Sequence, residues 1–132
     1  MSNIVLVTNN SLVVEKYSEK IEICNLENYT FVETLEFVRD KVHGGHKLLT
    51  HPLSGSVKPN ETPFKSIVIG KNKGKVDFDS LNIIEQSIAA ANKFIHGRKT
   101  PNWTDKVRDD FRLVDSTIIG SAINSMSGKY VG

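Results

Sequence analysis

The sequence has little of what would stabilise a small extracellular domain or anchor a chain in a membrane. It contains one cysteine, Cys24, among 132 residues, so no disulfide can form within the chain. Its start, Met1-Ser2-Asn3, has neither the basic residues nor the apolar run of a signal peptide. No stretch approaches the roughly 20 apolar residues of a transmembrane helix. We therefore expect a cytoplasmic protein that does not contact a membrane.

The chain also lacks a large excess of one charge, since it contains 17 basic and 15 acidic residues. The charges are unevenly spread, however. Between His43 and Lys75 there are six lysines and one acid, Glu61, and the remainder of the chain is net acidic. Either an anionic partner near the middle of the chain or simple solubility of lysine-rich turns explains this pattern. Phe64 is the only aromatic residue in that segment, which argues against a nucleic acid bound by stacking.

Common motifs for cofactors and metals do not occur. Neither GxxxxGK[ST] nor GxGxxG is present, so no nucleotide cofactor is expected. His43, His46 and His51 cannot form a helical zinc pair, because Gly44-Gly45 interrupts the helix between the first two. Cys24 has acidic neighbours, which disfavour a reactive thiolate. We predict no metal site, no cofactor and no catalytic cysteine.

The apolar patterns that are present predict strands alternating with helices. Short runs rich in β-branched residues, or with alternating polarity, predict strands at 4–7, 21–24, 47–50 and 66–70. Apolar residues three and four positions apart predict helices at about 12–19, 31–42, 81–95 and 107–126. Thr30 and Glu33 have the spacing of a capping box, and Thr104 can cap the last helix.

Such alternation predicts a single three-layer α/β domain over residues 1–132. We expect about four strands in a mainly parallel sheet, with residues 4–7 central and helices on both faces, as in Rossmann-like and flavodoxin-like folds. The helices also carry apolar positions beside their main stripes, at Ile83, Phe94, Ile119 and Ile123. A four-stranded sheet would not readily cover these residues, so a homodimer is expected.

Ligands of parallel sheets collect outside the carboxyl ends of the strands, and two loops are expected there. One is Thr8 to Ser11; the other runs from Thr50 to Phe64, contains three prolines and has no periodicity. Ser54-Gly55-Ser56 could cradle an anion with backbone N–H groups, with Lys58 as a point charge and His51 as a donor or acceptor. The candidate ligand-binding residues are Asn9, Asn10, Thr50, His51, Ser54, Gly55, Ser56, Lys58 and Asn60.

Each of these features also has a purely structural interpretation. The loop could cap the sheet, with its serine and asparagine side chains bonded to their own backbone. Asn9 and Asn10 could cap the helix that starts near Ser11. Trp103, between the last two helices, is expected to be a packing anchor rather than a binding platform.

One long run has a family resemblance. Residues 45–64 read GHKLLTHPLSGSVKPNETPF, and this run resembles the signature of the GrdX family. Thr8-Asn9-Asn10 and Pro101-Asn102-Trp103 are supporting similarities, so the resemblance extends over nearly the whole chain. Members are small proteins encoded with components of glycine, sarcosine and betaine reductases, which are selenium-dependent systems of amino-acid-fermenting anaerobes. The resemblance implies an accessory role there and transfers no catalytic residue.

These observations leave three hypotheses for function. The first is a non-enzymatic accessory protein that binds a small anionic metabolite, or a component of the reductases, through residues 50–64. The second is a small enzyme for a carboxylate- or phosphate-bearing metabolite, with His51 as acid or base and Ser54-Gly55-Ser56 as an oxyanion cradle. The third is a structural partner that docks through its helices, which would require an exposed apolar patch.

Overall fold

Seven regular elements form the protein in the computed structural model, which describes residues 3–55, 57–97 and 101–130. The strands are β1 (Ile4–Thr8), β2 (Glu22–Asn25) and β3 (Ser66–Gly70). The helices are α1 (Ser11–Tyr17), α2 (Phe31–His43), α3 (Phe78–Gly97) and α4 (Asp105–Tyr130). The three strands and four helices agree in position with predicted elements; the predicted strand at 47–50 is not a strand.

The strand order is β2-β1-β3, so β1 is central, as the sequence predicts. β2 runs parallel to β1, with Leu6 opposite Ile23. β3 runs antiparallel to β1, with Leu6 opposite Val68. The sheet is therefore small and mixed, and the prediction of a four-stranded, mainly parallel, Rossmann-like or flavodoxin-like sheet is wrong.

The segment 47–50 explains the error. It makes a single bridge, Leu48 to Ile69, and two backbone hydrogen bonds to β3, all antiparallel. Among the described residues between this segment and β3 there is no helix, so the chain returns through the loop instead of crossing over the sheet. Parallel neighbours require a crossover, whereas a loop is enough for antiparallel ones. Residues 47–50 and 66–70 therefore form a wide, irregular hairpin with the proline-rich loop as its connection.

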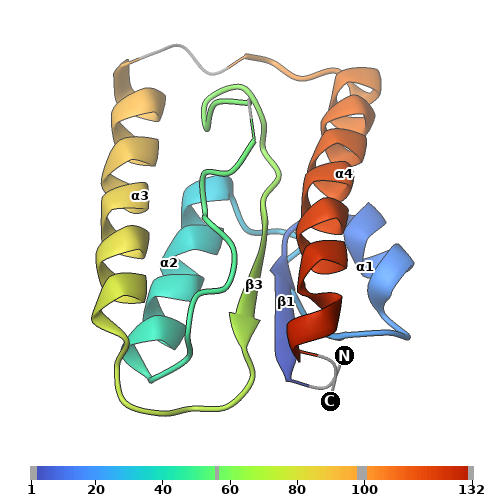
Figure 1. Ribbon diagram of the computed structural model, residues 1–132. Coiled ribbons are helices and arrows are strands. Elements are labelled where there is room, and N and C mark those ends of the chain that lie inside the picture. Colours follow the sequence, from blue (N-terminus) through green and yellow to red (C-terminus); the bar gives the residue numbers. More distant parts are fainter. Residues whose placement is uncertain (1–2, 56, 98–100, 131–132) are drawn as a thin grey trace.

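Helices cover both faces of the sheet (Figure 1). On one face, Val7, Ile67 and Ile69 pack with the apolar residues of α2 and α3. On the other face, Ile4, Leu6 and Val68 pack with α1 and α4. These two clusters are the core, and the alternation of successive side chains along β1 and β3 supplies residues to each of them.

The apolar face of α4 differs from the predicted one. Ile119 and Ile123 are buried in the core, whereas Val107 and Val114 from the predicted stripe are exposed. Ile119 and Ile123 therefore supply no surplus apolar surface for a homodimer. Among the described residues, no helix has both the length and the apolar content needed to cross a membrane.

Candidate functional site

The two asparagines that follow β1 hold other segments in place. Asn9 donates from Nδ2 to the carbonyl oxygens of Tyr29 (3.0 Å) and Pro63 (2.8 Å), and its Oδ1 accepts from the Lys65 N–H (2.8 Å). The buried Asn9 thereby ties the β2–α2 connection to the end of the proline-rich loop.

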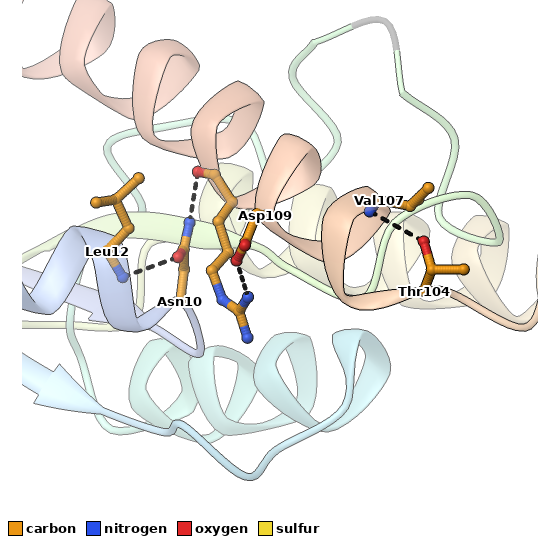
Figure 2. Close-up of polar contacts among 6 residues, drawn as sticks. Asn10, Leu12, Thr104, Val107 and Asp109 are labelled. Atoms are coloured by element: carbon orange, nitrogen blue, oxygen red, sulfur yellow. Dashed lines mark hydrogen bonds and ion pairs between the residues drawn. The ribbon is translucent and has the colours of Figure 1, made fainter.

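Asn10 is the N-cap of α1, which confirms the capping interpretation. Its Oδ1 accepts from the Leu12 N–H (3.1 Å), and its Nδ2 donates to the Arg112 carbonyl (2.9 Å), as Figure 2 shows. Nδ2 also donates to Asp115 Oδ2 (3.0 Å), and the side chain is fully buried. Both ends of this amide are thus engaged within the protein.

The loop residues named as candidates point in different directions. Thr50 Oγ1 accepts from the Val68 N–H (3.0 Å) and so extends the hairpin. His51, Ser54, Gly55 and Lys58 are exposed, and Ser56 lies outside the described residues. Lys58 lies 6.0 Å from the centre of the Phe94 ring. Asn60 is buried, and its Oδ1 has no hydrogen-bond partner in the described part of the chain. The structure therefore does not gather these candidates around one point.

The exposed turn at Ser54 and Gly55 contacts Lys65 and α4. The Ser54 carbonyl oxygen accepts from Lys65 Nζ (3.0 Å), and Gly55 adopts a φ of +101° close to Ile118. An added Cβ at Gly55 would lie 2.5 Å from Ile118 Cδ1. Glycine is therefore needed at this position for close packing on α4.

A groove of about 590 Å³ lies at the carboxyl ends of β1 and β2, beside the proline-rich loop. This volume is typical of sites for small molecules. The last turns of α3 and the first turns of α4 reach the same end of the molecule, at the top of Figure 1. The lining residues are Asn9, Glu27, Asn28, Tyr29, Thr30, Phe31, Val32, Pro59, Thr62, Pro63, Phe64, Asn92, Ile95, Trp103 and Arg108. Most of them are apolar or neutral.

Arg108 supplies the positive charge of this groove. Its guanidinium group stacks 5.2 Å from the centre of the Phe64 ring and makes no ion pair with any described residue. Arg112 stacks on the same ring at 4.7 Å, but its Nη1 is paired with Asp109 Oδ1 at 2.6 Å (Figure 2). A half-buried guanidinium that is held by stacking and lacks a carboxylate can donate two parallel hydrogen bonds to an oxyanion.

Trp103 fixes the loop to the α3–α4 connection. Its Nε1 donates to the Glu61 carbonyl oxygen (2.8 Å), so the residue is an anchor, as expected, and also part of the groove wall. Thr104 caps α4 by accepting from the Val107 N–H (3.2 Å), which confirms the predicted cap (Figure 2).

In the comparison with family models, residues 5–124 match GrdX-like protein. The chain belongs to this family. Comparison with curated proteins and with solved structures gives no match. The family resemblance seen in residues 45–64 is therefore confirmed, and the groove described above is a property of a GrdX-like chain.

His51 of this GrdX-like protein is poorly arranged for acid–base chemistry. Its Nδ1 accepts from the Leu53 N–H (3.1 Å), and the side chain is exposed. Glu61, the local acid that could orient it, accepts instead from the Lys58 N–H (3.1 Å). Burial raises the pKa of the Cys24 thiol, so this cysteine is not activated either. No cluster of metal-ligating side chains occurs among the described residues.

Two residues of this GrdX-like chain that the sequence did not single out carry much of the polar structure. Asp115 of α4 accepts from the Ser66 N–H (3.1 Å), the Ser66 hydroxyl (2.7 Å) and Asn10. Arg108 is the groove's cation. Both residues lie on α4, an amphipathic helix with many charged residues. Its sequence pattern does not indicate that Asp115 faces the sheet or that Arg108 faces the groove.

Proposed function

We propose that this protein is a cytoplasmic, non-enzymatic accessory protein of the glycine, sarcosine and betaine reductase systems and that it binds a small anionic metabolite. The groove between the proline-rich loop and the start of α4 is the binding site. Membership of the GrdX-like family supports the accessory role. The guanidinium of Arg108, which has no carboxylate partner among the described residues, lies in a groove of suitable size and supports the anionic ligand.

The geometry favours this groove over the exposed turn at Ser54 and Gly55. An anion in the groove would replace water at a half-buried cation, and the low polarity of the wall would strengthen that contact. The turn, by contrast, directs its Ser54 carbonyl oxygen to Lys65. The sequence-based prediction of an anionic ligand near the 50–64 loop is kept, and the residue expected to hold the charge is now Arg108.

A thermal-shift screen tests the proposal. Glycine, sarcosine, betaine, acetyl phosphate, phosphate and selenite are added to the full chain. A ligand present at 100 times its Kd should stabilise the protein by about 2.7 kcal/mol. The best ligand is then titrated against wild type, Arg108→Met and the control Lys106→Met, which removes an exposed charge on the same helix.

We expect Arg108→Met to weaken binding about ten- to a hundredfold, since a hydrogen bond to a charged group contributes roughly 1.5–3 kcal/mol. Lys106→Met should bind like wild type. Equal affinity of wild type and Arg108→Met would contradict the proposed site. If no anion in the screen binds, co-elution of the same three proteins with purified reductase components tests the other expected class of partner.

A further inference from the structure

Lys65 is a buried lysine next to Phe64, and it does not line the groove. It directly precedes β3, and its backbone is fixed by two hydrogen bonds with Asn9. Its side chain is only 5% exposed. Lysine is almost never this buried unless its ammonium group is paired with a carboxylate.

The amino group of Lys65 makes no such pair. Its Nζ donates to the Ser54 carbonyl oxygen (3.0 Å) and lies 3.4 Å from the Ser54 hydroxyl, and it forms no ion pair with a described residue. Asp115 is the other charged residue lining the same space, but its oxygens are occupied by Ser66 and Asn10. Burial lowers the pKa of Lys65, and the charge of Asp115 only partly opposes this effect.

A small cavity adjoins this lysine. It has a volume of about 20 Å³, enough for about one water molecule, and lies between the proline-rich loop and α4. Apart from Lys65, Ser54, Thr62 and Asp115, its lining is apolar: Phe31, Leu53, Val57, Phe64, Phe111, Val114 and Ile118. An apolar wall excludes charged molecules, because they would lose their hydration there. Small neutral molecules are the compounds that could approach Nζ.

We propose that Lys65 is a reactive amine whose partners are small neutral carbonyl compounds, which it binds as imines. The neutral Nζ attacks the carbonyl carbon and forms a C–N bond, which gives a carbinolamine. Loss of water then breaks the C–O bond, and the water carries away the carbonyl oxygen and both amine hydrogens. A desolvated lysine in an apolar pocket is a recognised arrangement for such chemistry. This site is separate from the anion groove and does not depend on it.

Reductive alkylation of the full-length protein tests the proposal. Formaldehyde and cyanoborohydride are added at pH 6.5, 7.5 and 8.5, and peptide mass spectrometry follows each lysine over time. Benzaldehyde is used in parallel as a carbonyl compound too large for the cavity. Exposed Lys71, Lys73 and Lys75 are internal references in the same sample. Lys65→Arg identifies the modified peptide, and its melting curve reports whether the fold survives.

We expect Lys65 to react with formaldehyde faster than the reference lysines at pH 6.5, because its lowered pKa leaves a larger neutral fraction of the amine. The advantage should be absent with benzaldehyde. A Lys65 rate at or below that of the exposed lysines at all three pH values would overturn the proposal. The wild-type measurement decides this even if Lys65→Arg does not fold.

Discussion

At the scale of single residues, the centre of the molecule depends on a carboxylate. Asp115 bonds to Ser66 at the start of β3 and to Asn10 at the start of α1. The Ser66 hydroxyl also lies 2.7 Å from that of Thr8. A buried polar group with all its partners specifies one arrangement of the elements around it, whereas loss of one partner leaves the others unsatisfied.

Asp115→Asn should therefore be strongly destabilising. The new amide group would place a donor or a weaker acceptor where Ser66 and Asn10 now donate. We expect a loss of about 2–3 kcal/mol in the free energy of unfolding, measured by urea denaturation. Asp109→Asn, which alters an exposed pair with Arg112, should change it by less than about 0.5 kcal/mol. Similar values for both variants would show that the buried network contributes little.

Lys65 should also make stability depend on alkaline pH. Burial lowers the pKa of Lys65 in the folded protein below 10.5, while Asp115 partly opposes the shift. The unfolded chain then binds more protons in the window between the two pKa values, so stability rises with pH there. Relative to Lys65→Met, the wild-type free energy of unfolding should increase as the pH approaches 10.5. The control Lys71→Met, exposed and paired with Glu22, should keep the wild-type trend. Parallel curves for wild type and Lys65→Met would contradict this expectation.

At the scale of elements, the proline-rich loop packs closely against neighbouring segments. Trp103 bonds to the Glu61 carbonyl, Asn9 to the Pro63 carbonyl, and Gly55 approaches Ile118. The sequence predicts the loop, its bounds and its position beside a strand end. It does not predict these contacts, because they join segments that are far apart in the chain and have no shared pattern.

Gly55→Ala tests how tightly the loop is seated. A φ of +101° costs an L residue about 1–2 kcal/mol, and the new methyl group would also meet Ile118. We expect a loss of at least about 1 kcal/mol in the free energy of unfolding. Gly74→Ala is the control, since an added Cβ there meets no atom within 4 Å. A Gly55→Ala variant as stable as wild type would show that the loop is not closely packed at this point.

At the scale of the whole molecule, local signals were sufficient for the elements but not for their arrangement. The Thr30–Glu33 capping box and the apolar runs at 4–7 and 66–70 are local, and each is found as predicted. The direction of β3 depends on whether the preceding connection contains a helix, and residues 47–50 resembled a further strand. The groove was missed in part because Arg108 and Asn92 come from helices whose ends meet only after folding.

The hydrogen bonds of Asp115 with Ser66 and Asn10 determine how late the fold can be completed during synthesis on the ribosome. β1 emerges first, yet its partner β3 follows about 60 residues later: the Thr8–Ser66 contact spans 58 positions. Asp115 bonds to Asn10 across 105 positions, so this central network is incomplete until the first part of α4 has left the exit tunnel. Long-range pairings of this kind form slowly because the intervening chain must first be ordered. During synthesis, the edge of β1 that pairs with β3 is therefore exposed for longer than the edge that pairs with β2, and nascent chains of this protein have an interval in which chaperones can bind that edge.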